Sequence, residues 1–269
     1  MDKALILARG LGTRMRREAP QAHLSAVQER IAATGVKALM PIDRPFLDYV
    51  LTAVADAGYR RVCLVIGPEH DELRHYYGAT LSYTRLQVEF AVQAEPRGTA
   101  DAVAAGESFA AGEPFLAINS DNYYPVAALA ALRQLAGPGL ALFARESMLA
   151  DSNIPAERLL RFAVVETDAD GQLRRIIEKP SADQLDALPP PVGVSMNCWR
   201  FGPEIFAACR AIAPSPRGEL EITDAVQYAT DVLGIRYRAL PFAAAVLDLS
   251  SREDVAGVTA RLAGMEVRL

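Results

Sequence analysis

The sequence has few cysteines, no excess of basic residues and no long apolar run. Its three cysteines form no Cys-x-x-Cys pair, so neither a disulfide framework nor a zinc knuckle is expected, and a reducing compartment fits best. The net charge of −5 argues against a general binder of nucleic acids or anionic membranes. The first apolar stretch, residues 4–8, is too short for a signal peptide, and no run approaches the ~20 residues of a membrane span. We therefore expect a soluble cytoplasmic protein.

What the sequence does contain is typical of a globular protein. Of its 269 residues, 51% are hydrophobic and 23% charged, which argues against disorder. A chain of this length can bury a large core without the help of a metal or a disulfide. The acidic net charge leaves a phosphate site open, because such a site needs only local charge and backbone N–H groups.

Short apolar runs alternate with helix-like segments along the whole chain. This alternation predicts the α/β class, with a doubly wound, mostly parallel sheet and helices on both of its faces. The expected strands are residues 3–8, 61–66, 86–92, 114–119, 140–144, 161–166, 173–177 and 236–241. The expected helices are residues 22–33, 45–57, 69–77, 100–110, 126–135, 203–211, 221–231 and 252–262. A ligand site should lie at the carboxyl ends of the strands.

Two segments interrupt the alternation. Residues 168–171, with the sequence DADG, predict a hairpin turn. Residues 181–191 end in three prolines and predict a surface loop. Neither segment is typical of a linker and no internal repeat is present, so we expect a single domain over residues 1–269.

Residues 5–15, with the sequence LILARGLGTRM, carry the most information. An apolar strand leads directly into Gly10 and Gly12, which let the backbone turn sharply and approach an anion closely. A plain tight turn between strand and helix is one interpretation. A dinucleotide fingerprint would need a third glycine where Met15 stands, and no Gly-Lys-Ser/Thr follows as in a Walker A loop. The pair Thr13 and Arg14 favours a triphosphate-binding loop, because arginine supplies a forked cation.

Residues 7–15 resemble the signature of the sugar-1-phosphate nucleotidyltransferases, the nucleoside-diphosphate-sugar pyrophosphorylases. Further segments resemble motifs of this family in the same order, and together they extend from about residue 4 to residue 254: residues 37–49, 93–102, 119–122, 178–180, 218–224 and 246–251. The sequence departs from the family at Arg9, where Gly or Ala is usual, and at residues 162–164, where Tyr-Gly-Val is frequent. The segment between Arg14 and Lys37 is also long and is expected to hold an extra helix.

The resemblance implies a Rossmann-like nucleotidyltransferase fold with a small sugar-binding β extension and no β-helix acyltransferase domain. Residues of about 1–125 would form a nucleotide-binding half, and residues of about 126–269 a sugar-phosphate-binding half. The implied enzyme transfers a nucleotidyl group from a nucleoside triphosphate (NTP) to a sugar-1-phosphate, with Mg²⁺ as cofactor and with pyrophosphate as the second product. No nucleic acid or membrane partner is expected, and a homo-oligomer is compatible with the sequence.

The resemblance also assigns roles to individual residues. Arg14 would hold the leaving phosphates, Lys37 would neutralise the α-phosphate region, and Lys179 would hold the sugar phosphate. Asp121 and Asp248, which each follow a short apolar run, would bind Mg²⁺. The expected nucleotide-binding residues are Ala8, Gly10, Gly12, Thr13, Gln93, Gly98 and Thr99. The expected sugar-phosphate-binding residues are Asn122, Glu178 and Asn197.

Two other functions remain open at this stage. One is a non-catalytic nucleotide-sugar-binding subunit, with a regulatory or assembly role on the same fold. The other is a nucleotidyltransferase that acts on a phosphate other than a sugar phosphate. The presence of all the expected cations and carboxylates favours catalysis over the first alternative. The nucleobase and the sugar are not determined by the sequence.

Overall fold

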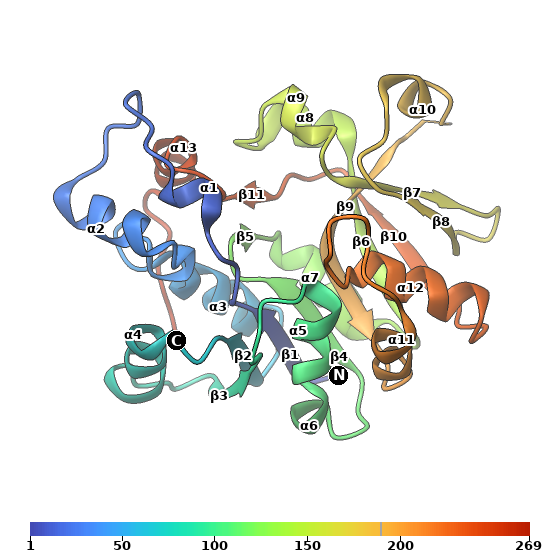
Figure 1. Cartoon of the computed structure of the whole chain (residues 1–269), viewed down its shortest axis with the longest axis horizontal. Helices are drawn as coiled ribbons and strands as arrows, with labels where there is room; N and C mark the ends of the chain where they lie inside the picture. The colour runs from blue at the N-terminus through green and yellow to red at the C-terminus, as the bar shows by residue number, and fades with distance from the viewer. Residues whose placement is uncertain (189) are drawn as a thin grey trace.

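The computed structural model describes residues 1–188 and 190–269, and its centre is a mixed sheet with helices on both faces (Figure 1). The sheet order is β10-β6-β9-β4-β1-β2-β3, with β7 and β8 attached beside β9, and β5 and β11 form a separate pair. The strands are β1 (Lys3–Leu7), β2 (Arg61–Ile66), β3 (Gln87–Val92), β4 (Phe115–Asn119), β5 (Asn122–Tyr123), β6 (Gly139–Ala144), β7 (Ala163–Thr167), β8 (Leu173–Ile177), β9 (Gly193–Phe201), β10 (Arg238–Phe242) and β11 (Leu247–Asp248).

Helices of unequal length connect these strands. They are α1 (Thr13–Arg16), α2 (Ala26–Thr34), η1 (Lys37–Leu39), α3 (Phe46–Asp56), α4 (Asp71–His75), η2 (Tyr76–Thr80), α5 (Thr99–Ala105), α6 (Glu107–Ala110), α7 (Val126–Gln134), α8 (Arg145–Asp151), α9 (Ala156–Leu159), α10 (Ala182–Asp186), α11 (Ile205–Ala211), α12 (Ile222–Asp231) and α13 (Asp254–Leu262). Over the described ranges, none of them is both long enough and apolar enough to span a membrane.

Strand β1 lies at the heart of the sheet and is buried on both faces. It pairs in parallel with β2 on one side and with β4 on the other. Ala4 and Ile6 pack into one apolar cluster together with α3 and α7, whereas Leu5 packs into a second cluster with α5, α11 and α12. Successive side chains of a strand point to opposite faces, so one apolar run serves both clusters. The predicted doubly wound α/β architecture is therefore confirmed.

The hairpin predicted at residues 168–171 is also confirmed. Strands β7 and β8 pair antiparallel, and the backbone N–H of Asp168 donates to the carbonyl oxygen of Gln172 at 2.9 Å. Gly171 has φ of +71°, a conformation that glycine adopts without steric cost. The Asp168 Oδ1 atom accepts from two backbone N–H groups within the turn.

The longest strand of the sheet, β9, is absent from the predicted set. It runs antiparallel between β4 and β6, so its residues are buried although several are polar. Asn197 in its middle has φ of +53°, and the register with β6 shifts between Leu140 and Leu142. This irregularity breaks the alternation of period two by which strands are detected in a sequence.

Some predicted boundaries were wrong for local reasons. The helix expected from residue 22 begins at Ala26, because Ser25 caps it in a reciprocal pair of bonds with Gln28. The helix expected at residues 100–110 divides into α5 and α6 at Gly106. The loop expected at residues 181–191 contains α10, whose capping box is formed by Ser181 and Gln184. Pro189, within that expected loop, lies outside the described residues.

A buried carboxylate joins α3 to the segment that follows β2. Asp48 is fully buried, and it accepts hydrogen bonds from Tyr77 Oη at 2.9 Å and from Arg44 Nε at 2.8 Å. Burial raises the pKa of Asp48, and the bonds from Arg44 and Tyr77 oppose that shift. This carboxylate therefore satisfies the Tyr77 hydroxyl, which would otherwise be buried without an acceptor.

Replacing Asp48 is expected to destabilise the fold. Asp48→Ala leaves the buried Tyr77 hydroxyl without its acceptor, so we expect a loss of about 2–3 kcal/mol of unfolding free energy in urea titrations. A matched control is Glu89→Ala, which breaks an exposed ion pair with Arg61 and should cost less than about 1 kcal/mol. Equal losses in the two variants would contradict a special role for the buried carboxylate.

Candidate functional site

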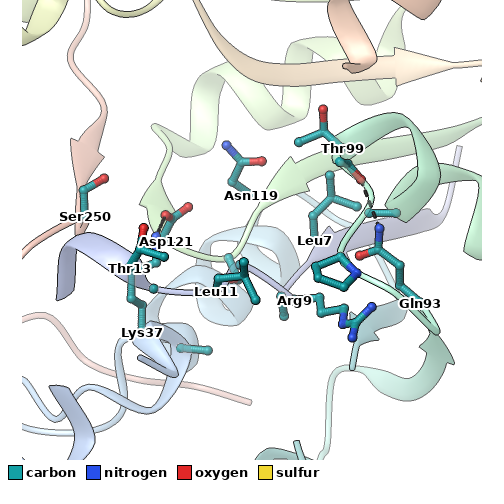
Figure 2. A pocket seen from close by; sticks show the side chains of 18 of the residues that line it. Leu7, Arg9, Leu11, Thr13, Lys37, Gln93, Thr99, Asn119, Asp121 and Ser250 are labelled. Atoms are coloured by element: carbon teal, nitrogen blue, oxygen red, sulfur yellow. Dashed lines mark hydrogen bonds and ion pairs between the residues drawn. The ribbon is translucent and has the colours of Figure 1, made fainter. Parts of the chain in front are cut away.

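A cavity of about 380 Å³ opens at the carboxyl ends of β1, β3 and β4 (Figure 2). This is the edge at which parallel strands of an open α/β sheet present a ligand site. Its lining comes from the loop after β1, the segment around Lys37, the loop before α5, the end of β4 and two later segments. The lining residues are Leu7, Ala8, Arg9, Gly10, Leu11, Gly12, Thr13, Arg14, Lys37, Ala38, Gln93, Pro96, Gly98, Thr99, Ala102, Asn119, Ser120, Asp121, Glu219 and Ser250.

The glycine-rich loop forms one wall, and it needs glycine at position 12 for a steric reason. Gly12 has φ of +60°, and a Cβ atom there would lie 2.1 Å from the backbone oxygen of Gly35. Gly10 has open space instead, since a Cβ atom there would have Lys37 Cε, 4.0 Å away, as its nearest neighbour. Arg14 is exposed at the cavity. The predicted loop residues therefore all lie where a ligand could reach them.

The long segment between Arg14 and Lys37 folds back onto this loop. Its helix α2 ends at Gly35, the residue whose backbone packs against Gly12, and the chain then enters the short helix η1 at Lys37. Arg252, just before α13, holds the helix α1 that follows the glycine-rich loop, because its Nε donates to the backbone oxygen of Met15 at 3.0 Å. The segment thereby returns Lys37 to the cavity, and the extra helix expected between Arg14 and Lys37 is α2.

Lys37 and Asp121 form an ion pair at one end of the cavity, near Thr13 (Figure 2). The Lys37 Nζ atom donates to Asp121 Oδ2. Their side chains are 13% and 18% exposed, so the pair is accessible to a ligand but partly shielded from water. This end of the cavity brings together a cation and a carboxylate that are 84 residues apart in the sequence.

Asp248 lies next to Asp121 through the pairing of β11 with β5. The backbone N–H of Leu249 donates to the backbone oxygen of Asp121 at 2.8 Å. Asp248 itself is only 3% exposed. Its Oδ1 accepts from Asn122 Nδ2 at 2.9 Å, and its Oδ2 accepts from Arg158 at 2.9 Å. Burial and the nearby charge of Asp121 raise the pKa of Asp248 to about 6, while Arg158 opposes the shift.

The two carboxylates have the donor chemistry that Mg²⁺ prefers. Magnesium is usually held by one or two carboxylates, with phosphate oxygens and water as its other ligands. In the chain as described, no three His, Cys, Asp or Glu side chains gather as a complete metal site. Asp121 and Asp248 would therefore need ligands from a bound substrate. Mutual repulsion contributes to the raised pKa of Asp248, and a cation between the two groups would relieve it.

The opposite end of the cavity is formed around Gln93, which is only 4% exposed. Its Nε2 donates both to the backbone oxygen of Gly98 at 3.0 Å and to Asp101 Oδ2 at 2.8 Å. Gly98 has φ of +120°, and a Cβ atom there would meet the backbone oxygen of Leu220 at 2.4 Å. Thr99 Oγ1 accepts from the backbone N–H of Ile222. The loop before α5 is thus bound tightly to the segment that leads into α12.

A second cavity of about 150 Å³ adjoins the first and shares Thr99 and Asn119 with it. Besides Thr99, four further predicted residues line it: Asn122, Glu178, Lys179 and Asn197. Burial raises the pKa of Glu178, and the hydrogen bond from Thr223 Oγ1, at 2.7 Å, opposes this shift. Lys179 has φ of +46°, so its backbone takes a conformation that is unusual for a residue other than glycine.

Several polar residues of the second cavity are absent from the predicted set. Arg217 is one of them, although it directly precedes the segment 218–224 that was singled out. It pairs with Glu221, which also lines the cavity. The remaining ones are Asn119, Arg161, Ser195 and Thr223. Arg158, which holds Asp248, was also missed, because a pair 90 residues apart leaves no local pattern.

Comparisons with known sequences agree with these observations. The chain is 35% identical over 233 residues to a glucose-1-phosphate thymidylyltransferase of Streptomyces griseus, covering 85% of this chain and 57% of that protein. It is 26% identical over 230 residues to a UTP–glucose-1-phosphate uridylyltransferase of Haloferax volcanii, covering 83% and 82% of the two chains. The chain spans less than two thirds of the length of the curated relatives that it matches first.

Solved structures share the fold. A UDP-glucose pyrophosphorylase complexed with UDP-glucose superposes with a TM-score of 0.73 at 21% identity, covering 97% of this chain and 98% of its own. A UTP-bound UGPase from Acinetobacter baumannii gives a TM-score of 0.73 at 16% identity, covering 99% and 95% of the two chains. The model of the nucleotidyl transferase family matches residues 3–240. Because this match includes most of the sequence and both cavities lie largely within it, the chain belongs to the nucleotidyl transferase family.

Proposed function

We propose that this protein transfers a nucleotidyl group from an NTP to a sugar-1-phosphate and releases pyrophosphate. The observation that carries the proposal is the pair of adjoining cavities, each with its own cationic side chains. The first cavity contains Arg14 and Lys37, and the second contains Lys179. Two phosphorylated substrates could therefore meet at the shared residues Thr99 and Asn119. The activities for which the two relatives are named, thymidylyl and uridylyl transfer to glucose-1-phosphate, support the same chemistry.

The reaction places few chemical demands on the protein. The attacking oxygen belongs to a sugar phosphate, which is already an anion at neutral pH, so no general base is required. Positioning of the reactants and stabilisation of charge then supply most of the catalysis. Lys37 would neutralise the α-phosphate, and Arg14 would bind the phosphates that leave as pyrophosphate. Lys179 would hold the incoming phosphate in line with the α-phosphorus.

The carboxylates complete this electrostatic arrangement. Asp121 and Asp248 would hold a magnesium ion, which supplies positive charge beside the α-phosphate when it is bound. Lys37 already neutralises part of the charge on Asp121, and Arg158 does the same for Asp248. Asn122 keeps Asp248 in place by donating to its Oδ1 atom. In the second cavity, Glu178 and Asn197 can accept hydrogen bonds from sugar hydroxyls.

The proposal predicts pyrophosphate release that depends on both substrates. Purified protein is incubated with each of several NTPs, Mg²⁺ and a panel of sugar-1-phosphates, and pyrophosphate is assayed. We expect release only when a sugar-1-phosphate is present. A sugar-1-phosphate would be held in the second cavity in position to attack, whereas a water molecule has no such binding site there. Release at a comparable rate with water alone would contradict the proposal. Nucleotide binding without any turnover would instead favour a non-catalytic subunit.

A further inference from the structure

The backbone of Asp248 is held by the segment that joins α8 to α9. Asn153, in this segment, bonds to it in both directions. Its Oδ1 accepts from the backbone N–H of Asp248 at 2.9 Å, and its Nδ2 donates to the backbone oxygen of Asp248 at 2.7 Å. The main chain at Asp248 is therefore fixed independently of its side chain, and the direction of the carboxylate is set by other residues.

Arg158, in α9, holds the Asp248 side chain by bridging two buried carboxylates. Its Nη2 donates to Asp248 Oδ2 at 2.9 Å, and its Nη1 donates to Asp254 Oδ1 at 2.7 Å. The side chains of the two aspartates are only 4% and 5% exposed, so water does not readily replace these bonds. A planar guanidinium gives its two bonds a fixed relative direction, which the rotatable ammonium group of a lysine does not.

Asp254, the second partner of Arg158, is itself firmly anchored. Its Oδ2 accepts from the backbone N–H groups of Ser250 and Ser251, at 3.0 and 2.7 Å. Ser250 lines the first cavity, so Arg158 ties the Asp248 side chain to a turn that borders this cavity. Within the part of the chain that the structure describes, the buried Nε of Arg158 has no hydrogen-bond partner. Hydrogen bonds to the two carboxylates alone therefore orient the guanidinium.

The Asp248 carboxylate retains capacity for a further ligand. A carboxylate offers roughly four lone-pair sites. Asn122 donates to Oδ1, Arg158 donates to Oδ2, and the Ser250 side chain bonds to the same carboxylate. The rotation of the carboxylate decides where the remaining lone pair points. Hydrogen-bonding partners behind a metal ligand generally set this rotation and thereby tune the affinity for the metal.

We propose that Arg158 is a positioning residue for metal binding, because its guanidinium rotates the Asp248 carboxylate so that a free lone pair faces the cation beside Asp121. The inference rests on the part of the proposed function in which Asp121 and Asp248 hold Mg²⁺ next to an NTP. Arg158 lines neither of the two cavities, so it acts through Asp248 and not on a substrate. Its effect is therefore confined to the contribution of the metal.

Arg158→Lys tests this inference, because it keeps the positive charge that the two buried aspartates need but removes the fork. The probe is whichever of ATP, CTP, GTP, UTP and dTTP binds the unmodified protein most tightly in Mg²⁺. Calorimetry without a sugar phosphate measures its affinity in Mg²⁺ and in EDTA. The ratio of the two affinities should fall at least about tenfold in Arg158→Lys, while the affinity in EDTA stays within about threefold.

Arg200→Lys is the matched control. Arg200 is also buried, and its Nε donates to the backbone oxygen of Gly137 at 2.7 Å. Its partners in the sheet, Leu116 and Gly139, lie near the beginnings of β4 and β6, at the end of the sheet opposite the cavity. This variant loses a guanidinium bond of similar burial, so it should melt earlier but keep the ratio of affinities of the unmodified protein.

Three results would overturn the inference: an unchanged ratio in Arg158→Lys, an equal loss of affinity in Mg²⁺ and in EDTA, or an equal fall of the ratio in Arg200→Lys. An unmodified protein whose NTP affinity does not depend on Mg²⁺ would also overturn it. A ratio that falls only in Arg158→Lys, in a protein that transfers no nucleotidyl group to any sugar-1-phosphate, would support the inference and contradict the proposed function.

Discussion

Asp248→Asn is expected to lower Mg²⁺-dependent turnover by about 10²- to 10³-fold, the usual effect of losing one preorganised charge at a reacting centre. The substitution removes a negative charge with almost no change of shape. Its remaining carbonyl oxygen can still accept from Asn122, and Arg158 keeps its second partner, Asp254, at 2.7 Å. The fold should therefore persist. Initial rates of pyrophosphate release are measured over a range of Mg²⁺ concentrations, together with the shift that Mg²⁺ and NTP cause in thermal unfolding.

The control for this variant is Asp254→Asn, which weakens the other ion pair of Arg158 without removing charge beside Asp121. We expect it to lower the melting temperature but to keep turnover within about threefold of the unmodified protein. Near-normal rates of Asp248→Asn at every Mg²⁺ concentration would show that Asp248 is not a metal ligand. A loss of activity in Asp254→Asn as large as in Asp248→Asn would show that the ion-pair network, and not the metal, is responsible.

Arg14→Ala should reduce turnover by about 10²-fold or more, which corresponds to the ~3 kcal/mol typical of one preorganised charge-stabilising donor. Arg14 is exposed at the cavity, so its side chain is available to a triphosphate. Exposed side chains without buried partners contribute little to stability, and the melting temperature should hardly change. Single-turnover rates and thermal unfolding curves measure the two effects separately.

Arg17→Ala is a suitable comparison for Arg14→Ala, because Arg17 is also exposed, directly follows α1 and is absent from the cavity lining. Its activity should equal that of the unmodified protein. An Arg14→Ala variant that melts much earlier yet retains its specific activity would show that Arg14 is structural. A similar loss of activity in both variants would point to a general effect of positive charge on substrate binding.

The parts of the fold that the sequence predicted are those with local patterns. Strands β2 and β8 were predicted at their observed boundaries, because continuous apolar or alternating runs end there at turn residues. Strand β9 was missed because Asn197 interrupts its alternation and because its burial comes from strands far away in the sequence. Helices α8 and α9, of seven and four residues, are too short to establish a period of 3.6 residues.

The residues of the candidate site also divide into those that lie in a continuous sequence motif and those whose surroundings come from distant parts of the chain. The glycine-rich loop and the segment around Gln93 are continuous motifs, so their cavity-lining residues could be named in advance. The orientation of Gln93 depends on Asp101, and the environment of Asp248 depends on Arg158, which lies 90 residues away. Whether Asp121 and Asp248 share a metal ion stays a prediction. Arg9 was noticed as an unusual residue, but only the structure shows that its buried Nη1 atom has no hydrogen-bond partner among residues 1–188 and 190–269.

The position of β9 has a consequence for synthesis of the chain on the ribosome. Strand β9 fills the space between β4 and β6, both of which precede it in the sequence. At the roughly 5–20 residues per second of translation, β4 emerges several seconds before the strand that covers its edge. An open edge of this kind readily pairs with other chains. The β4 edge therefore stays unpaired until β9, which ends at Phe201, has left the ribosome.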